Sequence, residues 1–435
     1  MQQPLGPHDY GFDFEGLRRG HYSDAYFLNG ARVLSRLGEE GARFEGRSPR
    51  PSLAELDATS VAVGDIEGEM QFFASREPFC IAAGVDAAIC ILRECTGYFD
   101  PGGRFVNTAG SLEIDAVPEG TRLRPLAPAM KVRGRYRDFA AQETTTLGML
   151  SRASLVATNV FRVLEAGRGT PVFFFPARFD GYFTQSLDGH AYCVAVDAWN
   201  REHGAGLVPM VSTDAQGAWW KGRGGGTVAH AYILCFLADT AEAMLAFAKH
   251  MPLDVKRIAL VDTNNDCVED SARTAIAFFR RHCELLGRGE HAEAERYRLY
   301  GVRADTAGNL RDASVEPIGC EGADLGVCPR LICNIRRRLD HLHECADVPS
   351  ALRPRAREFF RGVKIVASGG FTEDKVRLFT KLGVPVDIYG IGAHFFAGAN
   401  PFTADVVRVK IGGAWREMAK IGRGPWENPD LRRVQ

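Results

Sequence analysis

Residues 364–392, KIVASGGFTEDKVRLFTKLGVPVDIYGIG, decide the fold class. The runs KIVASGG (364–370) and VDIYGIG (386–392) are short and apolar, and the stretch from Thr372 to Leu382 between them has a helical rhythm. Short apolar runs separated by a helix are typical of parallel strands that are buried on both faces. This stretch therefore predicts one strand–helix–strand unit of a parallel sheet.

The same pattern recurs upstream of this stretch. A long helical region at 138–166 is followed by three more apolar runs: VFFFP (172–176), RIALVDT (257–263) and YGVRAD (300–305). Helical stretches from Ala229 to His250 and from Val268 to Leu286 lie between the runs. Five or six such units in about 230 residues favour an irregular α/β barrel over an open sheet. The segment 307–355, rich in Cys, Arg and Pro, is predicted to be an insertion on the barrel rim.

The first third of the chain has a different texture. Residues 22–37 have a helical apolar rhythm, preceded by the N-cap types Ser23 and Asp24. Three segments, 58–72, 105–116 and 121–132, look like strands, and Cys80 to Gly97 looks like a helix. We therefore expect an N-terminal α+β domain at 1–135, the barrel at 136–400 and a C-terminal segment at 401–435 that returns to the N-terminal domain.

Composition excludes several classes of protein. With 53 basic and 54 acidic side chains among 435 residues, the net charge of −1 gives no electrostatic basis for binding nucleic acid. No run reaches the roughly 18 apolar residues of a membrane-spanning helix, and the N-terminus lacks the apolar core of a signal peptide. The 11 cysteines form no CxxC pair, so a zinc site at Cys320, Cys328, Cys333 and Cys345 is disfavoured. The chain is predicted to be cytoplasmic.

Polar residues and glycines end four of the apolar runs. They are Asp262, Arg303 with Asp305, Ser368 with Gly369 and Gly370, and Gly390 with Gly392. In a parallel barrel the carboxyl ends of the strands face the same side, so these groups should converge on one site. Paired glycines expose backbone N–H groups to a phosphate, although they also turn tight corners. The charged side chains suit a sugar, a phosphate or Mg²⁺, and structural salt bridges are the alternative.

Two further segments carry candidate ligand-binding residues. His230 follows GGGT (224–227) near the start of a predicted helix, where phosphate groups dock, so it is a candidate phosphate partner or phosphoryl acceptor. Thr227 precedes it as a candidate substrate-binding residue. In FFFPAR (173–178), Arg178 could hold the carboxylate of an aromatic ligand stacked on Phe175. A lone histidine or phenylalanine is otherwise usually a packing residue.

In this order, the segments resemble the nicotinate phosphoribosyltransferase family, which has the type II phosphoribosyltransferase fold. The resemblance runs from about Ser23 to Arg423. It is carried by SDAYF (23–27), GRYRDFAAQETTTLGMLSRAS (134–154), FFFPAR (173–178), GTVAHA (226–231), LVDT (260–263), VRADT (302–306), KIVASGGF (364–371) and YGIG (389–392).

The resemblance implies an activity and a role for each candidate residue. The family makes nicotinate mononucleotide and pyrophosphate from nicotinate and 5-phosphoribosyl-1-pyrophosphate, with coupled ATP hydrolysis, Mg²⁺ and a homodimer that shares its active sites. His230 matches the histidine that ATP phosphorylates, Arg178 and Phe175 match the pyridine pocket, and Tyr26 matches a tyrosine lent by the partner subunit. Arg303 and Asp305 match the phosphoribosyl-binding pair, and Gly369, Gly370 and Gly392 match the 5′-phosphate loops.

Two departures from the family pattern keep alternatives open. Phe179 follows Arg178 where the family usually has a second arginine, and RADTAG (303–308) lacks the family's second carboxylate. Nicotinamide is therefore the rival substrate to nicotinate. A catalytically silent paralogue that binds a nucleotide is a second alternative, because fold membership does not guarantee activity. An unrelated phosphate-binding barrel enzyme would need a catalytic Lys or Glu at a strand end, and the runs end in neither.

Overall fold

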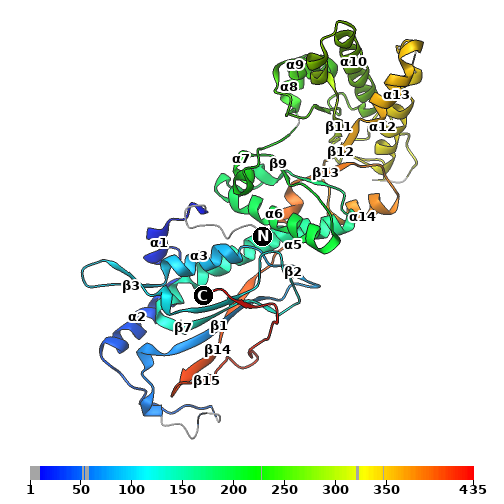
Figure 1. Ribbon diagram of the computed structural model, residues 1–435. Coiled ribbons are helices and arrows are strands. Elements are labelled where there is room, and N and C mark those ends of the chain that lie inside the picture. The colour runs from blue at the N-terminus through cyan, green and yellow to red at the C-terminus, as the bar shows by residue number, and fades with distance from the viewer. Residues whose placement is uncertain (1–9, 51–52, 54–57, 227, 320–322, 346) are drawn as a thin grey trace. The chain divides into compact units, whose positions relative to one another are not determined.

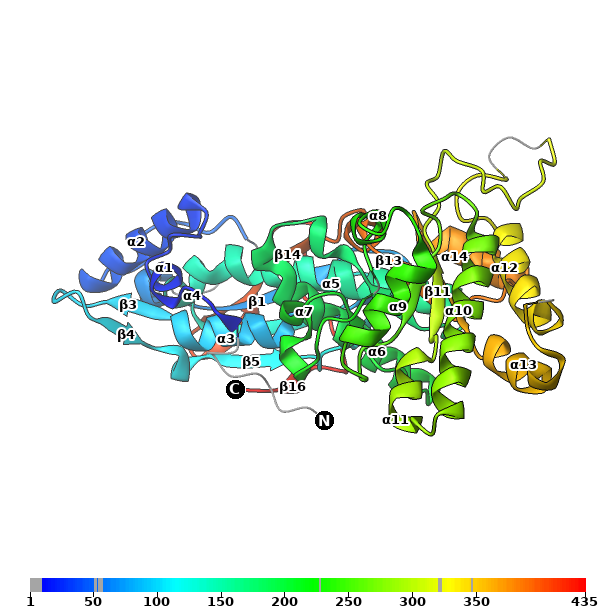
Figure 2. The same cartoon turned by 90° about the horizontal axis from the view of Figure 1, so that it is seen from above.

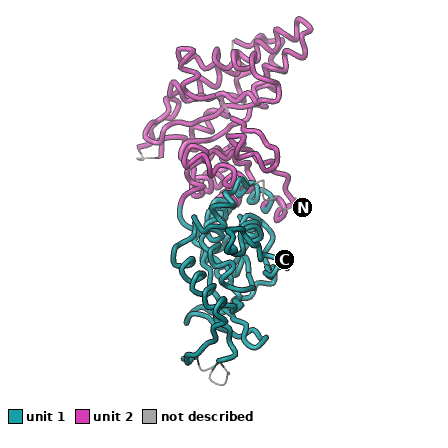
Figure 3. The backbone as a smooth tube through the Cα atoms, turned by 90° about the vertical axis from the view of Figure 1, so that its left-hand side faces the viewer, with its two compact units in different colours: residues 1–158, 190–198, 398–435 teal, residues 159–189, 199–397 magenta. Residues whose placement is uncertain are grey.

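The computed structural model describes residues 10–50, 53, 58–226, 228–319, 323–345 and 347–435. Contacts between Cα atoms divide the chain into two compact units (Figure 3). Unit 1 comprises residues 1–158, 190–198 and 398–435, and unit 2 comprises 159–189 and 199–397. Each unit is therefore assembled from segments that are far apart in the sequence.

Unit 1 is built on a six-stranded antiparallel sheet with the order β15-β14-β1-β7-β5-β16. The strands are β1 (Glu67–Ala74), β5 (Glu113–Ala116), β7 (Pro128–Arg135), β14 (Phe402–Ile411), β15 (Ala414–Glu417) and β16 (Arg432–Arg433). Phe72 of β1 lies opposite Met130 of β7 on one side and Ala404 of β14 on the other. The C-terminal strands thus complete the sheet that the N-terminal part begins (Figure 1).

Helices cover this sheet and close its core. They are α1 (Phe14–Arg18), α2 (Ala25–Glu39), α3 (Val85–Cys95), α4 (Tyr136–Phe139) and α5 (Glu143–Ala166), of which α5 belongs to unit 1 through Thr158. Two small two-stranded sheets pair β2 (Cys80–Ile81) with β6 (Arg122–Leu123) and β3 (Gly97–Phe99) with β4 (Phe105–Asn107). Phe72, Ile89, Ile114, Val132 and Leu150 form part of one buried apolar cluster. By contrast, α2 has no buried residue, although it carries several large apolar side chains.

Unit 2 is built on a six-stranded parallel sheet with the order β10-β11-β12-β13-β8-β9. The strands are β8 (Val172–Phe174), β9 (Met210–Val211), β10 (Ile258–Leu260), β11 (Gly301–Ala304), β12 (Lys364–Ala367) and β13 (Ile388–Ile391). All five neighbouring pairs are parallel, and the pairing of β13 with β8 brings the last strand next to the first. Among the described residues β9 and β10 do not pair, so the sheet is a partial barrel.

Helices connect the parallel strands of unit 2. They are α6 (Gln185–His203), α7 (Asp214–Gly217), α8 (His230–Leu234), α9 (Thr240–His250), α10 (Cys267–Gly287), α11 (His291–Ala294), α12 (Pro329–His341), α13 (Arg353–Arg361) and α14 (Glu373–Lys381). Residues 190–198 of α6 group with unit 1. Helices α10 and α12 lie close to strand β11 in both Figure 1 and Figure 2. The sheet carries Val302, Val366 and Ala367, which are fully buried.

The predicted parallel strands are confirmed, each to within three residues at its ends, whereas two other expectations are wrong. Residues 229–250 form two helices, because Leu237 and Ala238 adopt positive φ angles of 53° and 66° and end the first. The segment 307–355 contains α12 and the start of α13, and its place as an insertion on the barrel rim stays a prediction. Within 58–72 only 67–72 is strand, preceded by short 3-10 turns. No helix in the described part of the chain is long and apolar enough to span a membrane.

Candidate functional site

A cavity of about 740 Å³ lies at the carboxyl ends of the unit 2 strands. Its lining comes from the segments that follow β8, β11, β12 and β13, together with the segment that leads into α8. The predicted residues that line it are Phe175, Arg178, His230, Arg303, Asp305, Ser368, Gly369, Gly370, Gly390 and Gly392. Residues up to 217 positions apart in the sequence therefore meet at one face of the parallel sheet, as its topology predicts.

One end of the cavity is a backbone cradle between β12 and α14. Gly369 and Gly370 have φ angles of +86° and +66°, a conformation that side chains with a Cβ rarely adopt. The cradle leads into α14, where the Thr372 hydroxyl accepts a hydrogen bond of 3.3 Å from the Lys375 amide. A helix N-terminus that follows a glycine turn directs N–H groups at an anion. This end of the cavity suits a phosphate group.

Asp305 lies beside the cradle and joins it to β11. The Ser368 hydroxyl donates a hydrogen bond of 2.8 Å to Asp305 Oδ1. A Cβ on Gly369 would lie 3.4 Å from the Asp305 carbonyl and from its Oδ1 atom, so the glycine also makes room for the carboxylate. The other carboxylate oxygen has no hydrogen-bond partner among the described residues, so it can accept a hydrogen bond from a ligand hydroxyl. The arrangement fits a sugar whose phosphate occupies the cradle.

Arg303 places a cation at the floor of the cavity. Its guanidinium carbon lies 5.7 Å from the centroid of the Phe175 ring, and its Nε atom is buried with no hydrogen-bond partner among the described residues. Burial lowers the pKa of Arg303, while Asp305 and Asp262 raise it. An arginine with an unsatisfied buried donor is an energetic cost that an anionic ligand would relieve.

His230 is the first residue of α8 and is held by Asp262 from the end of β10. The His230 Nε2 atom lies 3.0 Å from Asp262 Oδ2. The Asp262 side chain is buried, and its Oδ1 atom has no hydrogen-bond partner among the described residues. Burial raises the pKa of Asp262, whereas His230 opposes that rise. Asp262 itself does not belong to the cavity lining, so it acts on the cavity through His230.

Aromatic rings line a further part of the cavity, at Phe175 and Phe179, which we call the aromatic end. Phe175 ends the β8 segment with its N–H donating 2.8 Å to the Ile391 carbonyl, and Phe179 follows in the same loop. A Cβ on Gly390 would lie 2.7 Å from the Phe175 ring, and one on Gly392 would lie 2.4 Å from the Phe179 ring. The two glycines therefore let both rings pack directly on the β13 backbone. Their predicted role as phosphate ligands stays a prediction beside this observed one.

Two predicted residues lie elsewhere. Thr227 falls outside the described residues. Tyr26 lies on α2 in unit 1, is 64% exposed, and donates a hydrogen bond of 3.1 Å to Asp24. Its expected place in the site of a second subunit stays a prediction.

The structure adds cavity residues that sequence reasoning did not single out. Phe179 was noted only as a departure from a family pattern, and His394 not at all. His394 Nε2 accepts a hydrogen bond of 3.1 Å from the Glu373 amide, so it satisfies the first N–H of α14. Its position two residues after Gly392, at the end of a predicted strand, was the signal that could have found it.

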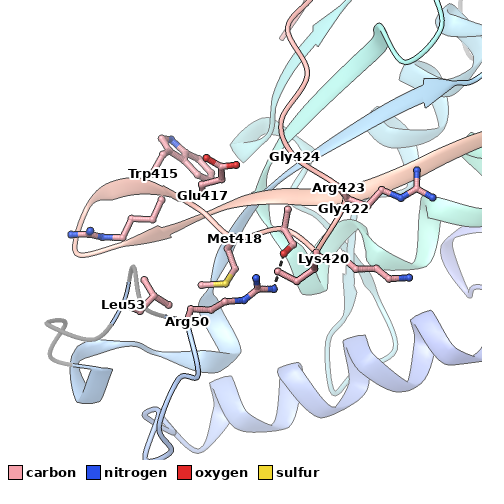
Figure 4. Close-up of a pocket in the computed structure, with 12 residues that line it drawn as sticks. Arg50, Leu53, Trp415, Glu417, Met418, Lys420, Gly422, Arg423 and Gly424 are labelled. Carbon is pink, nitrogen blue, oxygen red and sulfur yellow. Dashed lines mark hydrogen bonds between the residues drawn. The ribbon is translucent and has the colours of Figure 1, made fainter.

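A second cavity, of about 610 Å³, lies in unit 1 between Arg50 and residues 415–424 (Figure 4). Figure 4 shows Trp415 and Glu417 extending from one side of the ribbon, while Arg50 and Met418 lie on the other. Arg50 donates a hydrogen bond of 2.7 Å to the Ala419 carbonyl, which ties the cavity wall together. These side chains do not converge on a common point, so the unit 2 cavity is the stronger candidate.

Comparison with known proteins agrees with this geometry. Residues 57–154 match the family model of the quinolinate phosphoribosyl transferase N-terminal domain. Nicotinate phosphoribosyltransferase 2 of Arabidopsis thaliana is 24% identical over 306 residues, which are 65% of this chain and 50% of that protein. A nicotinate phosphoribosyltransferase of Mycobacterium tuberculosis is 24% identical over 297 residues, 68% of this chain and 52% of that protein. The chain is therefore similar to nicotinate phosphoribosyltransferases over about two thirds of its length.

Solved structures show the type II phosphoribosyltransferase fold. The nicotinate-nucleotide pyrophosphorylase of Pyrococcus furiosus superposes with a TM-score of 0.64 at 23% identity, covering 97% of this chain and 84% of that one. Human nicotinic acid phosphoribosyltransferase superposes with a TM-score of 0.56 at 18% identity, covering 91% and 75%. The chain spans about half the length of the curated relatives of the nicotinate phosphoribosyltransferase family that it matches.

Proposed function

We propose that the protein is a nicotinate phosphoribosyltransferase of NAD biosynthesis. It would form nicotinate mononucleotide and pyrophosphate from nicotinate and 5-phosphoribosyl-1-pyrophosphate. The observation that carries the proposal is the set of groups that line one cavity: the aromatic residues with Arg178, the Arg303–Asp305 pair and the glycine cradle at 369–370. These groups match an aromatic acid, a ribose and a 5′-phosphate.

The chemistry needs positioning and charge stabilisation more than a strong nucleophile. Displacing pyrophosphate from the anomeric carbon develops positive charge on the sugar, which the Asp305 carboxylate can stabilise while it holds the ribose hydroxyls. The cradle fixes the 5′-phosphate, and the ring of Phe175 supports the pyridine. Because the 5′-phosphate and the pyridine ring are both held, the pyridine nitrogen can meet the anomeric carbon within one cavity.

Mg²⁺ would assist this reaction mainly through the substrate. The Asp262 Oδ1 atom is buried without a hydrogen-bond partner among the described residues, and the nearby charge of Asp305 raises the pKa of Asp262. Among the described residues no three metal-binding side chains gather at one point. Two carboxylates suit a cation that takes most of its ligands from phosphates and water, and its charge would neutralise the pyrophosphate.

Coupling to ATP would run through His230. Because its Nε2 faces Asp262, the Nδ1 atom is the nitrogen left for a phosphoryl group. A carboxylate that accepts the Nε2 proton fixes this tautomer and stabilises positive charge on the ring, as in other His–Asp pairs. In the coupled step the Nδ1 lone pair would attack the γ-phosphorus of ATP, a P–N bond would form, the β–γ bridging P–O bond would break, and ADP would leave.

The protein would act as a homodimer with shared active sites. Supporting this, α2 has no buried residue, and its Tyr26 and Val33 side chains are 64% and 59% exposed. Large apolar side chains on an exposed helix are a common sign of a contact surface. Tyr26 would then reach the pyridine pocket of the second subunit.

Product formation tests the proposal. The purified protein would be mixed with phosphoribosyl pyrophosphate and Mg²⁺, with either nicotinate or nicotinamide and with or without ATP, and mononucleotide would be measured. We expect product from nicotinate that ATP increases, and an Asp305→Asn variant should lose it. Product from nicotinamide alone would favour the nicotinamide enzyme. Product from neither base would favour a silent nucleotide-binding paralogue.

Labelling tests the phosphohistidine separately. Incubation with γ-labelled ATP should place an acid-labile label on the protein, and His230→Ala should remove it. His250→Ala, at the exposed end of α9, is the matched control and should keep the label. Equal labelling of the wild type and His230→Ala would contradict the coupling while leaving the base reaction to stand on its own test.

A further inference from the structure

The Phe179 side chain lies at the aromatic end of the cavity, between a 3-10 turn and the backbone of a glycine. It follows the 3-10 turn Pro176–Arg178, and its N–H donates 2.8 Å to the Pro176 carbonyl. Its ring packs on the backbone of Gly392, where a Cβ would approach the ring to 2.4 Å. The turn on one side and the glycine on the other therefore fix the ring, although 48% of the residue is exposed.

The guanidinium of Arg178 lies over this ring. Its carbon atom is 5.3 Å from the Phe179 ring centroid, within the range of a cation–π contact. Arg178 forms no hydrogen bond or ion pair with any described residue of the protein. A contact with a ring face uses none of the five N–H donors of a guanidinium, so all five remain for a ligand. Gly392, Phe179 and Arg178 thus form a stack with a free cationic edge.

The second arginine of the cavity differs in its charge surroundings. Arg303 interacts electrostatically with the carboxylates of Asp305 and Asp262, which partly balance its charge. Arg178 forms no ion pair with any described acidic residue, and the ring of Phe179 lies next to it instead. The aromatic end of the cavity therefore offers one uncompensated cation, bounded by apolar surface.

We propose that Phe179 determines base specificity: its ring positions Arg178 to grip a single carboxylate of a planar aromatic acid, and it forms an apolar wall against a second carboxylate on the neighbouring ring carbon. Phe179 is a positioning residue, because it acts on the substrate's carboxylate through Arg178. The inference rests on the proposed function and names the substrate class of that site. A pyridine monocarboxylate fits, whereas a pyridine-2,3-dicarboxylate would place its second charge against the ring.

The test compares three variants of the full chain. Phe179→Leu keeps an apolar side chain but removes the ring face, Phe179→Tyr restores the ring, and Phe183→Leu is a matched control in the same loop that does not line the cavity. Calorimetric binding and KM would be measured with nicotinate, nicotinamide and pyridine-2,3-dicarboxylate, together with KM for phosphoribosyl pyrophosphate. A neutral amide gains less from an oriented guanidinium than a carboxylate does.

We expect Phe179→Leu to weaken nicotinate binding about two- to fivefold, the fold-change that corresponds to an exposed cation–π contact. Nicotinamide binding and the KM for phosphoribosyl pyrophosphate should change less, and Phe179→Tyr should restore nicotinate binding. Unchanged nicotinate binding in Phe179→Leu, or an equal loss for acid and amide, would overturn the inference while the proposed function stood. If the wild type bound no pyridine carboxylate and formed no mononucleotide, both would fall.

Discussion

His230 Nε2 and Asp262 Oδ2 lie 3.0 Å apart, and they join the first turn of α8 to the end of β10. The pair links an exposed ring at the cavity to a buried carboxylate that has no other partner among the described residues. It is the feature on which ATP coupling depends most directly.

Asp262→Asn should therefore uncouple ATP more than it impairs binding of the base. An amide does not hold a protonated Nε2 as a carboxylate does, so the histidine loses its fixed tautomer and its stabilised positive charge. We expect the initial rate of labelling by γ-labelled ATP to fall on the order of 100-fold or more. Asp254→Asn, an exposed substitution away from the cavity, is the control and should label normally. Normal labelling of Asp262→Asn would show that the carboxylate has no part in the coupling.

Gly369→Ala should weaken phosphoribosyl pyrophosphate binding through the shape of the cradle. The backbone φ of +86° strains any residue with a Cβ, and that Cβ would also lie 3.4 Å from Asp305. We expect the KM for phosphoribosyl pyrophosphate to rise about tenfold, the equivalent of 1.4 kcal/mol, with little change in the KM for nicotinate.

Gly383→Ala is the control that separates backbone strain from a change in the shape of the cradle. Gly383 follows α14 with a φ of +63°, and a Cβ there would meet no atom within 4 Å. It should lower the thermal midpoint without changing either KM. A similar rise in KM from both alanine variants would argue that general destabilisation, and not the cradle, limits binding.

The strands of unit 2 could be predicted from the sequence because each is a short run of local apolar residues. Lys364–Ala367 and Ile388–Ile391 are fully buried except at Lys364, so burial and local preference agree. Partners distant in the sequence could not be predicted in the same way. Nothing local to Gly392 shows that the Phe179 ring will rest on it, because that contact depends on the pairing of β13 with β8.

Helix ends were harder to predict from the sequence, for a related reason. The apolar rhythm of 229–250 continues through the break between α8 and α9, where Leu237 and Ala238 adopt backbone angles that their residue types disfavour. Asn264 donates a hydrogen bond of 3.0 Å to the Ala238 carbonyl and stabilises that turn from another segment. Tertiary contacts of this kind override local preference.

Glu143 should make the stability of unit 1 depend on pH. Burial, together with the charges of Asp405 and Asp24, raises the pKa of this carboxyl from 4.5 to about 8. Between these values the unfolded chain is ionised and the folded chain is protonated, so the folded state loses stability as pH rises from about 4.5 to 8. The loss would be on the order of 5 kcal/mol at its limit.

Glu143→Gln checks this dependence, because glutamine resembles the protonated acid and does not titrate. The urea midpoint of the variant should match the wild type near pH 5 and exceed it near pH 8. The difference between the two proteins isolates Glu143 from the other titrating groups. A constant difference across that range would mean that Glu143 titrates normally in the folded protein.

Arg357→Glu should stabilise unit 2 through the charge pattern of α13. Arg353, Arg357 and Arg361 follow at four-residue intervals, are all exposed, and form no ion pair with any described residue. Like charges at this spacing repel, and a glutamate at position 357 would replace two repulsive pairs with two attractive ones. Each change contributes about 0.2–0.5 kcal/mol, so we expect the thermal midpoint to rise by about 2 °C. Arg357→Gln removes the repulsion alone and should give roughly half the increase, and about 1 M salt should abolish both gains.

Enzymatic activity should not change, since α13 contributes nothing to the lining of the cavity. A lower midpoint for Arg357→Glu at low salt would mean that Arg357 makes a favourable contact that outweighs its repulsion by the other two arginines.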